Sequence, residues 1–292
     1  MAVDRRSLMK GMLAGGALLA LGFPPWTFAE SSVRRPKRCL LWLGGSRVDC
    51  MFVNGVKAAC GEMAYSGLQT VRQKGGVLTD TKRLAGLLQQ FCETRWIAVM
   101  DDANAVVFLE LVRTASAHLH AMGLHVCSAE PDSELRHEWT TTSPTYGMGG
   151  RLASQLIETK KHFRITENFL QEQSEGGPLK AWSAPGFSTY RSVEPEVTHL
   201  HYSGLPFSDG CHLLELNDLK KWTAIPRELC VSDSVGWWSE NWVEAVGYVV
   251  TRAALGVNSI PESCSTRVFV HQTEEKTRIQ PTERFVSFVI DL

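Results

Sequence analysis

The stretch that decides the fold runs from residue 81 to residue 127: TKRLAGLLQQFCETRWIAVMDDANAVVFLELVRTASAHLHAMGLHVC. Apolar residues recur at helical spacing in residues 81–93, and residues 96–100 form a continuous apolar run typical of a buried strand. Helical spacing returns in residues 104–122, and a second short strand is expected at residues 124–127. This alternation of helix and strand predicts a unit of parallel sheet with a right-handed crossover.

The same patterns predict further elements on both sides of this unit. The expected helices cover residues 53–65, 151–163, 213–222 and 242–255. The expected strands cover residues 38–43, 197–202, 229–232, 267–271 and 284–291. The last two strands alternate in polarity and are expected to pair antiparallel. Residues 38–292 are therefore expected to form one three-layer α/β domain, with a mostly parallel sheet, helices on both faces and an antiparallel C-terminal strand pair.

The chain begins with a basic pair, then an apolar stretch, then small residues. Arg5-Arg6-Ser7-Leu8-Met9-Lys10 carries two arginines, two apolar residues and a lysine, and residues 11–23 are apolar. Thirteen residues are too few to span a bilayer, which takes about 20. Thr27-Phe28-Ala29 supplies small residues for cleavage. Residues 1–29 are therefore predicted to be a cleaved twin-arginine signal peptide, followed by a linker at 30–37.

This signal predicts where the protein works. The twin-arginine translocase would be its partner during export, the periplasm its location, and no membrane span would remain after cleavage. The route generally carries proteins that have already folded. Residues 1–29 hold three of the 30 basic and one of the 31 acidic residues, so 27 basic and 30 acidic residues remain. This balance offers no broad basic field for nucleic acid.

The eight cysteines all follow the predicted cleavage site, but none forms a Cys-x-x-Cys pair. The signatures of structural zinc, iron–sulfur clusters and c-type haem are therefore missing from the sequence. No dinucleotide-binding motif is recognised either, so the sequence identifies no cofactor. Several cysteines lie in apolar, strand-like runs, where buried thiols are common. We expect most of the eight to be core thiols, with at most two disulfides.

Polar residues follow three of the expected strands, where ligands bind in open α/β sheets. Ser46 follows the first strand, Asn104 follows the strand at 96–100, and Asp209 and His212 follow the strand at 197–202. This layout resembles that of SGNH (GDSL-type) hydrolases over residues 39–128 and 205–222. Those enzymes cleave esters with a serine that a histidine activates and an aspartate orients.

The resemblance implies a role for each residue. Ser46 would be the nucleophile, His212 the base and Asp209 the group that orients His212. Asn104 and Gly67 would stabilise the oxyanion. The family's Gly-Asp-Ser is replaced here by Gly44-Gly45-Ser46. The lead prediction is therefore a periplasmic serine esterase or acyltransferase, and the rival is a non-catalytic binding or accessory protein.

A second resemblance points elsewhere. Residues 201–209, His-Tyr-Ser-Gly-Leu-Pro-Phe-Ser-Asp, are similar to a histidine-containing loop in the C-terminal half of β-ketoacyl synthases. This resemblance implies a degenerate thiolase-fold protein, with Cys60 at a helix start as nucleophile and His201 beside it. The family's second histidine and its lysine are missing, and Trp237 and Trp238 stand in that stretch.

Two further features suggest ligands. The segment Gly147-Met148-Gly149-Gly150 precedes an expected helix, where backbone N–H groups can hold an anion. Trp237, Trp238 and Trp242 could line a cleft for a small molecule or a polysaccharide, or could be core residues.

Overall fold

The computed structural model describes most of the chain after residue 35. The described ranges are 36–127, 134–143, 146–159, 161–170, 186–194, 196–214, 219–226, 236–256, 264–273 and 283–292. The predicted signal peptide, most of the linker, the expected strand at 229–232 and Cys230 lie outside them. None of the described helices is long and apolar enough to cross a membrane.

The described elements alternate between strands and helices along most of the chain. The helices are α2 (Asp49–Glu62), η1 (Val77–Thr79), α3 (Thr81–Gln90), α4 (Asp102–Thr114), α5 (Gly149–Glu158), α6 (Phe207–Leu213), η3 (Leu219–Lys221) and α7 (Trp242–Ala254). The strands are β1 (Cys39–Leu43), β2 (Leu68–Arg72), β3 (Arg95–Met100), β4 (His118–Cys127), β5 (Leu135–Thr141), β6 (Phe163–Phe169), β7 (Ser188–Ser192), β8 (Thr198–Ser203), β9 (Thr223–Ala224), β10 (Thr266–His271) and β11 (Glu283–Asp291).

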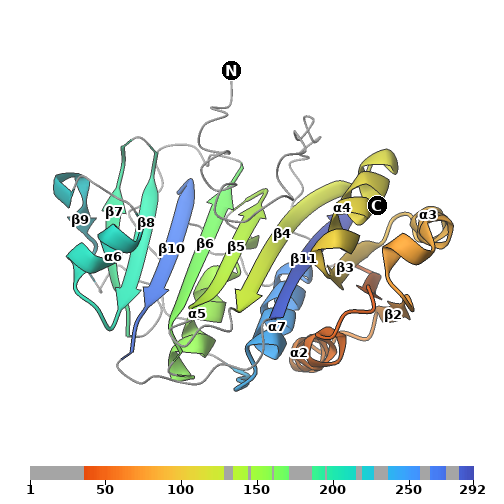
Figure 1. Cartoon of the computed structure of the whole chain (residues 1–292), viewed down its shortest axis with the longest axis horizontal. Coiled ribbons are helices and arrows are strands. Elements are labelled where there is room, and N and C mark those ends of the chain that lie inside the picture. The colour runs from red at the N-terminus through yellow and green to blue at the C-terminus, as the bar shows by residue number, and fades with distance from the viewer. Residues whose placement is uncertain are drawn as a thin grey trace.

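These strands form one sheet in the order β2-β1-β3-β11-β4-β5-β6-β10-β8-β7-β9 (Figure 1). The α/β class is confirmed, but the prediction of a mostly parallel sheet is wrong. Six of the ten strand pairings are antiparallel and four are parallel. The pattern in residues 81–127 predicted further parallel βαβ units. Instead, β11 lies antiparallel between β3 and β4, and β5 pairs antiparallel with β4.

The predicted C-terminal strand pair is also wrong. The strand β10 lies between β6 and β8, whereas β11 lies between β3 and β4 and is antiparallel to both. Alternating polarity identifies a strand but does not name its partner. Residues of β11 are buried on both faces, with Val289 in one cluster and Phe288 in the other, which suits a central position.

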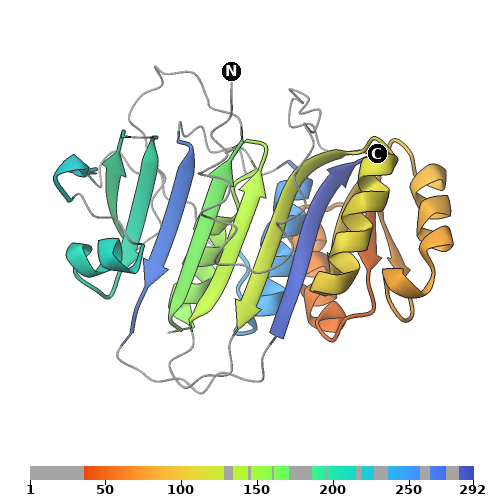
Figure 2. The same ribbon diagram turned by 45° about the horizontal axis from the view of Figure 1, so that its top comes forward.

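Two apolar clusters lie on opposite faces of the sheet. Ile97 and Val99 of β3 join the cluster under α2, α5 and α7, and their neighbour Ala98 joins the cluster under α3 and α4. Alternate side chains of a strand point to opposite faces, so helices cover both (Figure 2). A smaller cluster lies at the far end of the sheet, beneath α6.

The helix expected at 104–122 is shorter than predicted. It ends at Thr114, and Ser116 adopts a positive φ of 56° that turns the chain into β4. His118 and His120 therefore lie on a strand. The strands β1, β3, β4, β8 and β10 run in the same direction. We call the side of the sheet at which these strands end the carboxyl edge, and the side at which they begin the amino edge. The carboxyl edge is at the bottom of Figure 1.

Candidate functional site

The structure places the residues of the predicted catalytic triad at opposite ends of the sheet. Ser46 follows β1, the second strand, whereas Asp209 and His212 lie on α6, which follows β8, the ninth strand (Figure 1). Seven spacings of about 4.8 Å separate these strands by roughly 34 Å. A nucleophile and its base must approach to about 3 Å, so Ser46 and His212 cannot share a proton in this fold.

The Ser46 side chain has a structural task instead. Its Oγ donates to Asp49 Oδ1 at 2.5 Å, and the Ser46 backbone N–H donates to the same oxygen at 3.1 Å. The Gly45 N–H donates to Asp49 Oδ2 at 3.1 Å. Asp49 is buried in the first turn of α2, so these three bonds fix the turn that joins β1 to the helix.

Asn104 lies at the same edge as Ser46, but its amide group is already bonded. Its Nδ2 donates to Asp101 Oδ2 at 2.7 Å, and its Oδ1 accepts from the Leu78 N–H at 3.1 Å. These bonds tie the start of α4 to η1. Gly67 precedes β2 at the amino edge, where its carbonyl accepts from Cys39 N. The predicted oxyanion pair is therefore not brought together.

The alternative pair, Cys60 and His201, is also separated. Cys60 lies in the last turn of α2, not at a helix start, so the helix N-terminus cannot favour its thiolate. His201 lies on β8, where its Nδ1 is 2.9 Å from Thr189 Oγ1 and its ring stacks on Phe269. The two side chains are buried near opposite ends of the sheet.

The suggested anion site before α5 is filled by the protein itself. Glu167 Oε1 accepts from the N–H groups of Met148 and Gly149 at 2.6 and 2.7 Å. Arg267 Nε donates to Glu167 Oε2 at 2.9 Å, and both charged side chains are buried. A carboxylate on β6 thus occupies the place that an external anion would need.

The three tryptophans divide between core and surface. Trp242 is buried, and Trp237 packs against the same cluster and lies 4.8 Å from the Tyr248 ring. Trp238 is 43% exposed and donates its Nε1–H to the Gln155 carbonyl at 3.2 Å. At least two of the three therefore act as packing residues.

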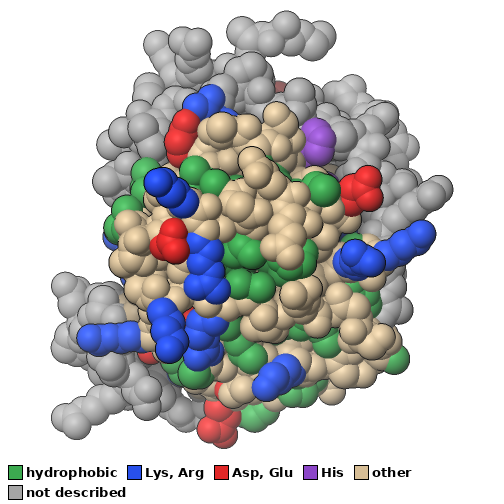
Figure 3. All heavy atoms as spheres, turned by 90° about the vertical axis from the view of Figure 1, so that its right-hand side faces the viewer, with side chains coloured by type: hydrophobic (Ala, Val, Ile, Leu, Met, Phe, Trp, Pro, Cys, Tyr) green, Lys and Arg blue, Asp and Glu red, His purple; other side chains and the backbone are tan. Residues whose placement is uncertain are grey.

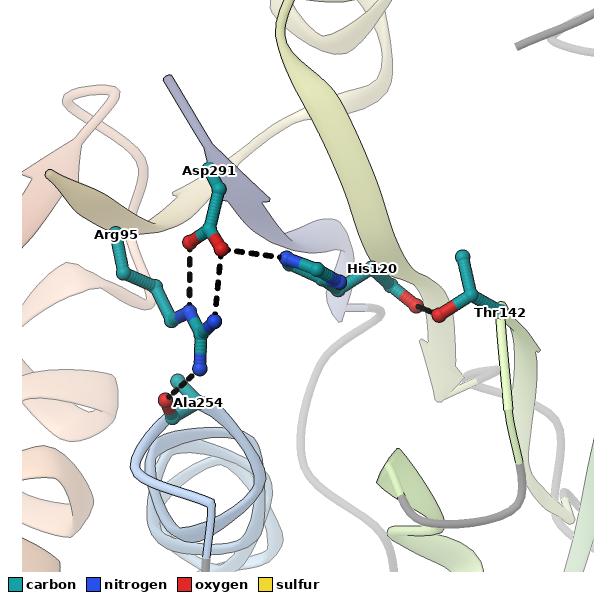
Figure 4. Close-up of polar contacts among 5 residues, drawn as sticks. All are labelled: Arg95, His120, Thr142, Ala254 and Asp291. Carbon is teal, nitrogen blue, oxygen red and sulfur yellow. Dashed lines mark hydrogen bonds and ion pairs between the residues drawn. The ribbon is translucent and has the colours of Figure 1, made fainter. Parts of the chain in front are cut away.

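A polar cluster that the sequence did not reveal lies at the amino edge (Figure 4). Arg95 donates to both carboxylate oxygens of Asp291, at 2.7 and 2.8 Å, and to the Ala254 carbonyl at 2.8 Å. His120 Nε2 lies 2.8 Å from Asp291 Oδ2, and the His120 ring stacks on Tyr146. The cluster joins the starts of β3 and β4 to the end of β11 and to α7.

The neighbours of Asp291 in this cluster determine its charge. Burial raises the pKa of Asp291, but hydrogen bonds from Arg95 and His120 outweigh burial and hold that pKa well below its usual range. The ionised Asp291 therefore accepts a hydrogen bond from His120 Nε2–H. Burial raises the pKa of the neighbouring Cys39 to about 12, so no thiolate is available beside it.

A second histidine cluster lies inside the core. His125 Nδ1 is 3.0 Å from His137 Nδ1, and His125 Nε2 is 2.9 Å from Ser287 Oγ. All three residues are buried, and Trp139, Trp242 and Phe285 pack around the two rings. Burial lowers the pKa of His137 to about 3, and burial together with His137 holds the pKa of His125 well below its ordinary value.

Sequence spacing did not predict either cluster, because the members of each cluster come from segments far apart in the chain. Arg95 and Asp291 are 196 residues apart, and His125 and Ser287 are 162 apart. The one available signal was a charged residue at the end of an apolar strand. Within the described part of the chain, no group of three or more His, Cys, Asp or Glu side chains could hold a metal ion.

Comparison with known proteins adds no relative: no protein-family model, curated protein or solved structure matches this chain.

Asp291→Asn should destabilise the protein by about 3 kcal/mol, because it leaves the buried Arg95 charge without its carboxylate. Urea unfolding followed by tryptophan fluorescence would measure the free energy of unfolding. Glu110→Gln is the matched control, since it breaks an exposed ion pair with Arg113 and should cost much less than Asp291→Asn. Equal losses in the two variants would show that solvent, not Asp291, stabilises Arg95.

Stability should fall as the pH drops below about 6.5, because unfolded histidines then bind protons that buried His125 and His137 cannot bind. The window extends down to about 3, the pKa of folded His137. Each histidine contributes a slope of about 1.4 kcal/mol per pH unit within it. Between pH 4 and 5.5, His137→Phe should reduce the measured slope by about this amount.

The matched control is His212→Phe, which removes an exposed histidine instead of a buried one. Carboxylate contributions are common to all three proteins and cancel in the comparison. An unchanged slope in His137→Phe would mean that His137 takes up its proton in the folded state.

Proposed function

We propose that this protein is an exported, non-catalytic accessory protein of the periplasm, which uses its large sheet as a scaffold for binding a partner. The main support is the distance between Ser46 and His212, with seven strand spacings between their elements. Hydrolysis of an ester needs these two groups in contact. A binding scaffold has no such requirement, and it tolerates a Ser46 hydroxyl that is committed to Asp49.

The first 29 residues support the location. Their basic pair, short apolar stretch and small residues fit a signal for the twin-arginine translocase, which carries folded cargo. A sheet with β11 between β3 and β4 suits such a route, since these early strands are joined only after residues 283–291 have been added. A small molecule or a polysaccharide is the alternative ligand to a protein partner.

The enzyme hypothesis can be tested with wild type and Ser46→Ala on a panel of short-chain and long-chain esters. We expect both proteins to show the same background hydrolysis, since His212 lies seven strand spacings away and the Ser46 hydroxyl is bonded to Asp49 in a structural turn. A known serine esterase in the same assay serves as the positive control, and far-UV circular dichroism confirms folding of the variant. Turnover by wild type that disappears in Ser46→Ala would restore a catalytic Ser46 and refute the accessory function.

Export can be tested by replacing Arg5 and Arg6 with lysine in the full-length chain. The wild-type protein should be recovered from the periplasmic fraction with Glu30 as its first residue, and the double variant should remain in the cytoplasm as the precursor. Lys10→Gln is the control, because it removes one positive charge and keeps the arginine pair. Periplasmic recovery of the double variant would contradict the proposed route.

A further inference from the structure

The strand β2 forms one free edge of the sheet. Among the described strands it pairs with β1 alone, in parallel, with Leu68 opposite Cys39 and Arg72 opposite Leu43. The Gly67 carbonyl accepts from Cys39 N and the Gln73 N–H donates to Leu43 O, which fixes the phase of this ladder. In a parallel pair only alternate residues bond to a given neighbour. Gln69 and Val71 therefore bond to β1.

The intervening residues, Leu68, Thr70 and Arg72, point their backbone N–H and C=O groups away from the sheet. Among the described residues, none forms a backbone hydrogen bond with these groups. Thr70 and Arg72 are exposed, so solvent reaches this row of donors and acceptors. The strand contains no proline, and its register with β1 is continuous without a bulge. Edges that are protected against pairing usually carry such features.

The surroundings of this edge are basic. Residues 63–90 contain Arg72, Lys74, Lys82 and Arg83, all exposed, against a single acidic residue. That residue, Asp80, accepts a hydrogen bond from the Arg83 N–H at the start of α3. Residues 63–90 thus have a net charge of +3, whereas the whole chain has −1. Figure 3 views this end of the sheet, where several Lys and Arg side chains and some Asp and Glu side chains lie around a partly apolar surface.

A further basic residue, Lys57, lies on α2. Arg72 Nη2 lies 4.0 Å from Cys50 Sγ, so the start of α2 lies beside the end of β2. Lys57 is two helical turns further on the same face of α2, a distance of about 10 Å. The exposed Lys57 therefore adds a positive charge to the helix that begins beside the end of β2.

We propose that the β2 edge, defined by Leu68, Thr70 and Arg72, binds an extended acidic segment of a partner protein as an additional strand of the sheet. The outward N–H and C=O groups would bond the backbone of that segment, and Lys57, Arg72 and Lys74 would select acidic side chains. A second copy of this chain is a poor occupant, because two basic edges would face each other. The proposal rests on the accessory function above and names the partner's chemistry.

The test uses a fluorescein-labelled nonapeptide of alternating glutamate and valine, which favours an extended conformation. Wild type should bind it, with affinity at least tenfold weaker in 500 mM salt than in 50 mM salt. A lysine–valine peptide of the same length should bind at least tenfold more weakly. Absence of binding by the acidic peptide at 1 mM, or equal binding of both peptides, would overturn the proposal.

The decisive variant is Thr70→Pro, which removes one outward N–H without breaking a bond to β1. It should weaken binding of the acidic peptide at least tenfold, whereas Thr70→Ala keeps the N–H and should bind like wild type. Circular dichroism and the urea midpoint check that Thr70→Pro is folded. Lys57→Glu with Lys74→Glu should also weaken binding at least tenfold.

Two outcomes would separate this proposal from its alternatives. Unchanged affinity in folded Thr70→Pro would show that the peptide contacts the basic side chains without adding a strand. Binding of a short oligothymidine as tightly as the acidic peptide would show a general polyelectrolyte surface. Both outcomes overturn the docking mode, and both leave the ester assay, which tests the accessory function, unaffected.

Discussion

The ion pair between Arg95 and Asp291 holds together the part of the sheet on which the other elements depend. It connects the end of β11 to the start of β3, and it therefore stabilises β11 in the middle of the sheet. His120 adds the neighbouring strand β4 to the same carboxylate. With β11 in place, Val289 and Phe288 supply apolar surface to the clusters on both faces.

The polar residues that draw attention in the sequence mostly stabilise local structure. Asp49 accepts hydrogen bonds from the turn that contains Ser46, and Asp101 bonds Asn104 at the start of α4. Glu167 caps the start of α5. In each case a buried or half-buried carboxylate or amide satisfies backbone groups that would otherwise be left without hydrogen bonds. Residues spaced like a catalytic site can therefore arise from the requirements of turns and helix starts alone.

Local features of the fold could be predicted from sequence, and long-range ones could not. The apolar run at 96–100 and the helical spacing after residue 242 correspond to β3 and α7, because periodicity reports burial directly. The position of β11 depends on which strands it pairs with, and periodicity carries no information about pairing partners. The separation of Ser46 from His212 follows from strand order, which is equally hidden from local patterns.

The central position of β11 also constrains how the protein is made. Residues 283–291 are synthesised long after β3 and β4, yet among the described strands β3 and β4 have no common neighbour without them. β11 can pair with β3 and β4 only after residues 283–291 have been synthesised, through contacts that span nearly 200 residues and are slow to form. Until then β3 and β4 expose unpaired edges that invite aggregation. A nascent chain that has not yet reached residue 291 is therefore expected to need protection against aggregation.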